Sequence, residues 1–208
     1  MGPPAVITML RADIRRTYDY LQGSRWQKIA ACIASPGVQT VVVYRFGQWA
    51  RQQSKLLRCV LDPVYWIGST LMRIAWGIEL PRGAKIGPGL YIGHFGGITV
   101  SAGAVIGRDC NLSHAVTIGV AGEGAQRGVP TIGDQVYIAP GARIIGKITV
   151  GDNVKIGANA VIYKDVPDNA IVVLDPGFRI LSYDGNRRDR RVIDAGAARE
   201  RRRNASTG

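Results

Sequence analysis

The feature that most constrains this chain is a regular spacing of aliphatic side chains across residues 86–166. Aliphatic anchors recur there in steps of six positions, interrupted at two places: Ile86, Ile92, Ile106, Leu112, Ile118, Ile132, Ile138, Ile144, Val150, Ile156 and Ile162. A second apolar, mostly small residue often follows four positions later, as Val136 follows Ile132. A fixed sequence period is the signature of a repeat architecture, in which each unit buries its apolar side chains against its neighbours.

A period of six matches neither a coiled-coil heptad nor an amphipathic helix. It favours short strands separated by tight turns, with three units in each triangular coil and coils stacked at about the strand spacing of 4.8 Å. We therefore expect the anchors to point inward and to form one continuous aliphatic column. Gly and Asn at the corners supply the positive φ that such turns need. The sequence predicts a mainly β domain over residues 79–173.

The repeat has two irregularities, and insertions in a repeat are often placed on a binding face. Ile92 is followed by Val100 after eight positions, so two extra residues bulge out near the segment from His94 to Gly97. Ile118 is followed by Ile132 after fourteen positions, which places an insertion within residues 120–130.

The sequence before the repeat predicts helices, and we assign residues 1–78 to a helical N-terminal region. Apolar spacing indicates a helix over residues 5–22, and Ser35-Pro36 is a typical N-cap with a first-turn proline before a helix over 38–53. We expect Pro63 to open a third helix that reaches Trp76. Charged residues and Pro63 interrupt the apolar stretch 56–80, which favours a buried or interfacial helix over a membrane span.

The charge of the chain is uneven. Its net charge is +12, and the stretch from Gly185 to the end holds eight of its arginines. We interpret residues 174–208 as a C-terminal extension, disordered at its arginine-rich end, with weak association to an anionic membrane surface as an alternative. No interleaved aromatic or recognition motif supports nucleic-acid binding. The first residues lack a signal-peptide pattern, and the three cysteines lack the spacing of a metal site and cannot all pair, which suggests reduced thiols. We therefore expect a cytoplasmic protein, with peripheral attachment to the inner membrane as an alternative.

The chain has only two histidines, which excludes a site that needs three histidine ligands from one chain. His94 is the third residue of the hexad that starts at Ile92, and His114 is the third residue of the hexad that starts at Leu112. One full coil separates the two anchors. The register therefore predicts that both histidines stand on the same side of the coils, near the long insertion.

These residues also carry a resemblance. The segments IELPRGAKIGPGLYIGHFGGITVSAGAVIG and PTIGDQVYIAPGARIIGKITVGDNVKIGANAVIYKDVPDNA resemble the hexapeptide-repeat acyltransferases, and most of all the serine acetyltransferase branch with its exopolysaccharide-modifying relatives. The resemblance covers about residues 76–173. It implies a left-handed parallel β-helix, a homotrimer, and acetyl-CoA bound in a groove between neighbouring β-helices. From the few histidines and the cysteine spacing we expect no metal.

The resemblance also implies roles for individual residues. His94 would be the general base that takes the proton of an acceptor hydroxyl, since histidine titrates close to neutral pH. Glu79, fifteen residues earlier, stands where the family has an Asp that orients this histidine. His114 and Arg127 are candidate substrate contacts. Positions that match the family's coenzyme A contacts are Gly119, Ala139, Gly157, Ala158 and Lys164.

Some of these positions have structural explanations that remain open. The small residues are needed at the corners of the coil whether or not coenzyme A binds there. Lys164 could equally be a solvated surface charge, and His114 a surface side chain without a role in binding. Two departures concern the acceptor. The family's Asp immediately before the histidine is Gly93 here, and its Arg-His pair before the closing proline is Gly128-Val129. Those family residues help to hold the amino and carboxylate groups of serine.

We therefore predict an acetyl-CoA-dependent O-acetyltransferase that acts on a hydroxyl of a small molecule or saccharide. The alternative within this class is a true serine O-acetyltransferase of cysteine biosynthesis. The alternative of another class is a non-catalytic β-helix scaffold, which would have no affinity for coenzyme A.

Overall fold

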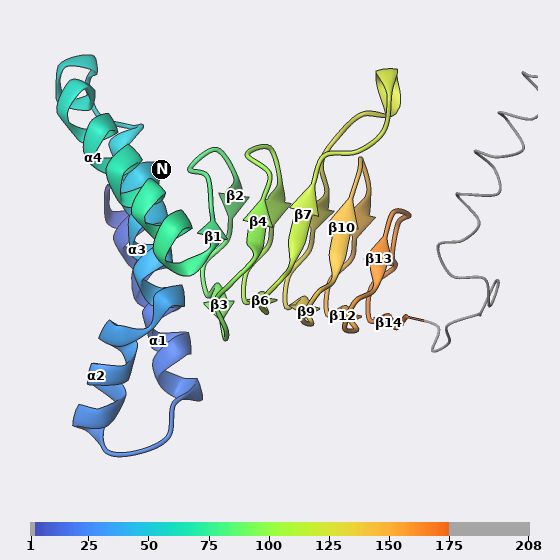
Figure 1. Cartoon of the computed structure of the whole chain (residues 1–208), viewed down its shortest axis with the longest axis horizontal. Helices are drawn as coiled ribbons and strands as arrows, with labels where there is room; N and C mark the ends of the chain where they lie inside the picture. The colour runs from blue at the N-terminus through green and yellow to red at the C-terminus, as the bar shows by residue number, and fades with distance from the viewer. Residues whose placement is uncertain (1–2, 175–208) are drawn as a thin grey trace, which may run out of the picture. The chain divides into compact units, whose positions relative to one another are not determined.

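The computed structural model describes residues 3–174, and its N-terminal part is helical (Figure 1). The helices are α1 (Pro3–Tyr20), α2 (Arg25–Ala34), α3 (Pro36–Ala50) and α4 (Lys55–Trp76). The predicted cap of α3 is confirmed, because the hydroxyl of Ser35 accepts a hydrogen bond from the Val38 N–H and Pro36 occupies the first turn. The sequence did not predict α2, although Ser24 and Gln27 form a capping box at its start.

The start predicted for the third helix is wrong. Helix α4 begins at Lys55, where the hydroxyl of Ser54 accepts a hydrogen bond from the Leu57 N–H, and Pro63 lies inside the helix. A proline inside a helix removes a backbone donor, yet helices whose packing supports them tolerate one. Helix α4 ends at Gly77, whose φ of +62° is the left-handed conformation of a helix C-cap.

No single helix among residues 3–174 is long and apolar enough to cross a membrane. Helices α2 and α3, bent by 63° at their junction, are together long and apolar enough to do so, by length and composition only.

The repeat folds as a left-handed β-helix of three parallel sheets, which confirms the predicted fold class. Sheet A has the order β1-β4-β7-β10-β13, sheet B β11-β8-β5-β2 and sheet C β14-β12-β9-β6-β3. The strands are β1 (Ile78–Glu79), β2 (Lys85–Ile86), β3 (Tyr91–Ile92), β4 (Ile98–Val100), β5 (Val105–Ile106), β6 (Asn111–Leu112), β7 (Thr117–Gly119), β8 (Thr131–Ile132), β9 (Tyr137–Ile138), β10 (Arg143–Ile145), β11 (Thr149–Val150), β12 (Lys155–Ile156), β13 (Val161–Ile162) and β14 (Ile171–Val172).

The inward column predicted from the six-residue period is confirmed. Every anchor of the period is at most 5% exposed, and anchors of successive coils pair in register, as Ile92 does with Leu112 and Leu112 with Ile138. Strand β14 pairs with β12, so the stacking continues past Val166, where the sequence pattern stops. The arginine-rich extension that we predicted lies outside the described residues.

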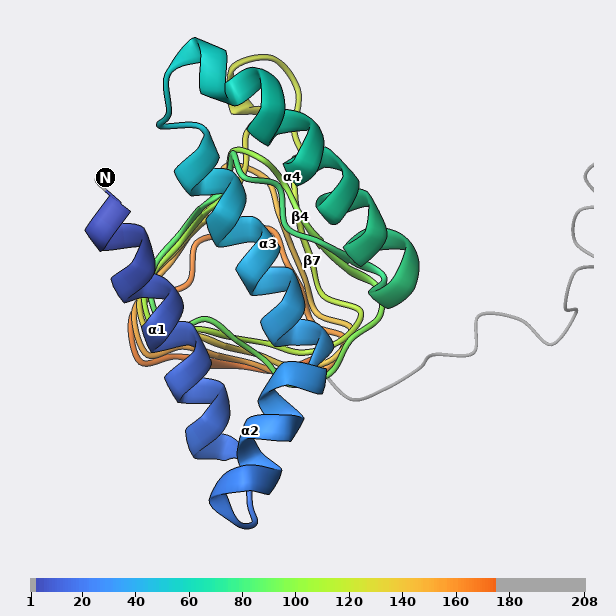
Figure 2. The same cartoon turned by 90° about the vertical axis from the view of Figure 1, so that its left-hand side faces the viewer.

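The helices cover the first coil end-on (Figure 2) and are fixed to it by a buried ion pair. Arg45 of α3 is fully buried, and its Nε donates to the Asp13 carboxylate of α1 at 2.8 Å. The same guanidinium donates to the carbonyl oxygens of Ile86 and Gly87, and the Leu90 N–H donates to Asp13 at 2.8 Å. Burial raises the pKa of Asp13, while the hydrogen bond and charge of Arg45 oppose that shift.

Candidate functional site

The two histidines lie at one corner of the triangular coil. We call this the histidine corner; it comprises the turns from sheet C to sheet A, residues 93–97, 113–116, 139–142 and 157–160. His94 lies between β3 and β4, and His114 lies between β6 and β7 in the next coil. Their rings are exposed, with centroids 5.8 Å apart and planes at 79°. The prediction that they share one side, one coil apart, is confirmed.

The bulge that carries His94 depends on two glycines with positive φ. Gly96 has a φ of +102° and Gly97 a φ of +67°. A Cβ on Gly97 would lie 3.2 Å from the Cα of Ala115, so this turn sits close against the coil below it. The Gly96 carbonyl accepts a hydrogen bond from the Ala115 N–H at 2.7 Å. The two extra residues therefore form a defined turn over the next coil.

The end of α4 supports the other side of the bulge. The Trp76 and Phe95 rings pack edge to face with centroids 5.4 Å apart. The Gly77 carbonyl accepts a hydrogen bond from Ile98 N–H at 3.0 Å, and a Cβ on Gly77 would lie 3.1 Å from the Gly97 nitrogen. The bulge is thus held between α4 and the second coil, which leaves the His94 side chain facing outward.

The bulge also presents unused backbone donors. Within residues 3–174, the N–H groups of residues 94–97 donate no hydrogen bond to protein, whereas Gly93 before them and Ile98 after them both do. A run of free N–H groups in a turn with positive φ forms a concave site for negative charge. These donors stand on the same turn as the His94 imidazole.

Glu79, the predicted orienting carboxylate, lies on β1 and is exposed. Its neighbour in the sheet register is Thr99 on β4. In the described part of the chain, no hydrogen bond or ion pair joins Glu79 to His94. The role of Glu79 stays a prediction.

The long insertion forms a hairpin that projects from the β-helix (Figure 1). Ala121 and Gly128 exchange two backbone hydrogen bonds of 3.1 Å, and a short 3-10 helix, η1 (Gly124–Gln126), forms the tip with Arg127 exposed beside it. We call the turns from sheet A to sheet B, residues 101–104, 120–130, 146–148 and 163–165, the hairpin corner. Sheet A separates it from the histidine corner, so the expectation that the insertion lies near the histidines is wrong within one chain.

The predicted coenzyme contacts divide between these two corners. Ala139, Gly157 and Ala158 follow strands of sheet C and lie at the histidine corner, one and two coils beyond His114. Gly119 ends β7, and Lys164 follows β13 with its ammonium 5.6 Å from the centroid of the Tyr163 ring, so both border the hairpin corner. In a single chain these five positions therefore do not form one surface.

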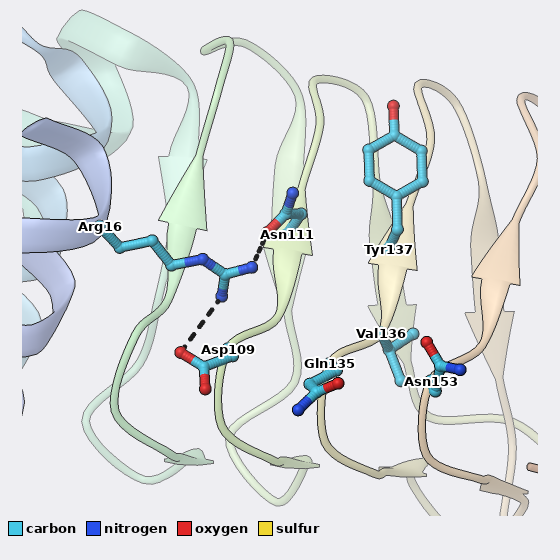
Figure 3. A pocket seen from close by; sticks show the side chains of 7 residues that line it. All are labelled: Arg16, Asp109, Asn111, Gln135, Val136, Tyr137 and Asn153. Atoms are coloured by element: carbon cyan, nitrogen blue, oxygen red, sulfur yellow. Dashed lines mark hydrogen bonds and ion pairs between the residues drawn. The ribbon is translucent and has the colours of Figure 1, made fainter. Parts of the chain in front are cut away.

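A polar hollow of about 390 Å³ lies away from both corners (Figure 3). It is lined by Arg16 of α1 and by Asp109, Asn111, Gln135, Val136, Tyr137 and Asn153 of the coils. Arg16 donates to the Gly89 carbonyl at 2.5 Å and to the Asn111 side chain at 2.6 Å, and its guanidinium lies 3.6 Å from Asp109. These contacts tie α1 to the coils, and the hollow holds neither histidine.

Among the described residues, no three His, Cys, Asp or Glu side chains cluster as a metal site would require. Cys32, Cys59 and Cys110 are free thiols. Burial raises the pKa of Cys110 to about 11, so this thiol is not activated.

Comparisons with known proteins agree with this geometry. The family model described as bacterial transferase hexapeptide (six repeats) matches residues 130–164. A serine acetyltransferase from Synechococcus elongatus is 32% identical over 180 residues, which cover 86% of this chain and 70% of that relative. The chain belongs to the serine acetyltransferase family. A second family member, from Mycobacterium tuberculosis, is 33% identical over 83% of this chain and 72% of its own length.

Solved structures of the family share the fold. Serine acetyltransferase from Neisseria gonorrhoeae in complex with serine superposes with a TM-score of 0.69 at 26% identity, over 86% of this chain and 70% of that one. The Brucella abortus protein in complex with coenzyme A has a TM-score of 0.70 at 27% identity and is covered to 69%. The Entamoeba histolytica isoform 3 structure in complex with cysteine, at 27% identity and a TM-score of 0.70, is covered to 61%, so this chain spans slightly less than two thirds of that protein.

Proposed function

We propose that this chain is an acetyl-CoA-dependent O-acetyltransferase whose general base is His94. The observation that carries the proposal is the outward His94 imidazole on a turn with four unused backbone N–H groups, in a member of the serine acetyltransferase family. A base and a group of fixed donors on one turn are what acyl transfer to a hydroxyl requires.

In the proposed reaction, neutral His94 takes the proton of the acceptor hydroxyl while that oxygen attacks the thioester carbonyl carbon. The carbonyl oxygen becomes an oxyanion, and free N–H groups of residues 94–97 are placed to donate hydrogen bonds to it. The intermediate then collapses with cleavage of the C–S bond. The imidazolium returns its proton to the departing coenzyme A thiolate, which leaves the acetyl ester and the free thiol.

A direct transfer fits the described residues better than a covalent acyl-enzyme. Cys110 is buried with its pKa raised to about 11, and its Sγ donates to the Gly133 carbonyl inside the coil. Cys59 lies on α4, and its Sγ donates to the Lys55 carbonyl of the same helix. Neither thiol is beside a histidine that could activate it.

Serine is the acceptor that the comparisons favour, because the relatives are serine acetyltransferases and one solved neighbour is in complex with serine. It is therefore the first acceptor to test. Serine acetylation is the alternative within the acyltransferase class that the sequence left open.

A saccharide or another hydroxyl compound is the second candidate, and the packing at two positions favours it. A Cβ on Gly93 would lie 3.1 Å from the Tyr91 ring, and a Cβ on Gly128 would lie 2.6 Å from the Lys147 Cβ. The Asp and Arg that the resemblance expects there to hold serine would therefore require their neighbours to shift. Arg127 stands one position earlier and is exposed, so it remains a candidate for a carboxylate contact.

Separation of the two corners within one chain supports the proposed homotrimer. If the hairpin corner of one copy faces the histidine corner of the next, Arg127 and Lys164 are brought to the side where Ala139 and Gly157 lie. Val161 on sheet A and Tyr163 at the hairpin corner beside it are 44% and 63% exposed, which suits contact between copies.

The test is release of free thiol from acetyl-CoA by the purified chain with serine, and in parallel with cell-envelope sugars. Faster release with serine than with any sugar would support the serine assignment, and the reverse would support the second candidate. A chain that binds no coenzyme A and releases no thiol with any acceptor would instead be a scaffold, and the proposal would fail.

A further inference from the structure

Helix α4 exposes a long row of apolar side chains. Its members follow one another in steps of three or four residues, so they share one side of the helix. They are Leu56, Val60, Val64, Ile67, Leu71 and Ile74, each between 53% and 86% exposed. We call this set the α4 row. The row runs along most of a helix of 22 residues, about 33 Å at 1.5 Å per residue.

The α4 row is not needed for the packing of the chain on itself. The opposite side of α4 faces α3, where Tyr65 is only 9% exposed and its ring fits over Gly47. Gly68 likewise faces Val43 of α3. Within residues 3–174, no segment covers the row. A contiguous apolar surface of this kind marks an interaction site.

The charges of the whole helical region, α1 to α4, are one-sided. Residues 3–76 contain ten Lys and Arg against three Asp. Each of these acids is ion-paired with arginine: Asp13 with Arg45, Asp19 with Arg15, and Asp62 with Arg58 and Arg82. Six cations of this region have no ion pair in the described part of the chain: Arg11, Arg25, Lys28, Arg51, Lys55 and Arg73. The helical end therefore presents positive charge without a compensating acid.

We propose that the α4 row lies on the surface of an anionic lipid bilayer, with α4 parallel to the membrane plane. An amphipathic helix with basic flanks and Trp or Leu on its apolar side binds in this way. Lys55 near the start of the helix and Arg73 near its end lie on the polar side of α4, where such helices carry their cations, and add to the attraction of an anionic surface.

The charge distribution favours a membrane over a second copy of the chain as the occupant. Two helical ends that met through their α4 rows would each bring an excess of unpaired cations, which repel one another. An anionic surface is attracted by the same cations and also buries the apolar row. The proposal uses no catalytic residue, so it stands or falls independently of the proposed function.

The test is sedimentation of the full chain with phosphatidylcholine vesicles that contain or lack phosphatidylglycerol. We expect binding to the anionic vesicles, weakened by added salt because the attraction of exposed charges is screened. The double variant Ile67→Glu with Leu71→Glu should lower the bound fraction by at least about tenfold, since it puts two carboxylates where apolar side chains would enter the interface.

A matched control is Ile171→Glu with Leu174→Glu. These residues are 71% and 54% exposed at the other end of the β-helix, and the pair adds the same charge. The control should bind like the unmodified chain. Equal binding by the α4 variant would show that another segment, such as the arginine-rich extension, carries the attraction, and would overturn the proposal. So would a fall in the native mass of the α4 variant without vesicles, because that result would assign the row to contact between copies.

Discussion

The histidine corner is built in two ways within the same β-helix. In the regular coils, the residue with positive φ donates its N–H to a carbonyl of the preceding coil: Ala115 to Gly96, Gly141 to His114, and Asn159 to Pro140, at 2.7 to 3.1 Å. In the coil that contains the bulge, residues 94–97 donate none of their N–H groups to protein within the described chain. The same corner thus stacks in one place and leaves its donors free in another.

The difference follows from position and length. The bulged turn lies in the first full coil, so no preceding coil offers carbonyls to its amides, and it is two residues longer than the regular corners. Regular corners satisfy their backbone groups and bury an anchor, so substitutions there should change the free energy of unfolding. The bulge presents its imidazole and amides to solvent, so replacing the exposed His94 side chain should change turnover at nearly constant stability.

The largest effect is expected for His94→Ala. Loss of a general base typically slows turnover by roughly 100- to 10,000-fold, so acceptor-dependent thiol release should fall by that factor. The His94 side chain is exposed, so the melting temperature should stay close to that of the unmodified chain. Unchanged turnover in a folded variant would remove His94 from the mechanism and leave the free amides of the bulge without a partner base.

The second prediction concerns the regular coils. Ile138 is fully buried in the column, and Ile138→Ala should lower the free energy of unfolding by roughly 2–5 kcal/mol, as measured by denaturant titration. Turnover per folded molecule should be retained under conditions where the variant is folded. A loss of turnover larger than the loss of folded protein would mean that the regular coils contribute directly to the chemistry.

The column and the relation of the histidines could be predicted because both depend on the period alone. A period of six assigns every third unit to the same sheet, so Ile92, Leu112 and Ile138 had to stack, and His94 and His114 had to share a corner. The cap of α3 could also be predicted, because a serine that caps a helix and a proline in its first turn act on the backbone next to them and need no distant contact.

What could not be read from the sequence depends on distances between segments. The insertion follows Ile118, one hexad after Leu112, so the period itself puts it one corner beyond the histidines, and the expectation that it lies near them did not use this register. Helix α2 is short, and its N-cap Ser24 lies only two residues beyond the end predicted for the first helix, so the pattern was not recognised. Pro63 indicated a helix start locally, but the packing of Tyr65 on Gly47 supports a helix that runs through it. The unused amides of the bulge leave no trace in side-chain spacing.

The smallest effect, and the sharpest test of the comparison, comes from two glycines of the same coil. Gly97 in the bulge has a φ of +67°, and Gly89, at the turn from sheet B to sheet C, has a φ of +78°. Replacing either by Ala places a Cβ in left-handed backbone, which costs about 1–2 kcal/mol. Additional crowding is expected in both, because the new Cβ would lie 3.2 Å from the Ala115 Cα or 2.1 Å from the Asp109 Oδ1.

Both variants should therefore lose a similar amount of stability in denaturant titration, while only Gly97→Ala should also slow thiol release, because it alone reorients the free amides beside His94. The loss should appear mainly in kcat, since an oxyanion donor acts on the transition state and not on the bound acceptor. If Gly89→Ala slowed the reaction as much as Gly97→Ala, the strain would be acting through the whole coil. The bulged turn and the regular corners would then differ in shape but not in their effect on the reaction.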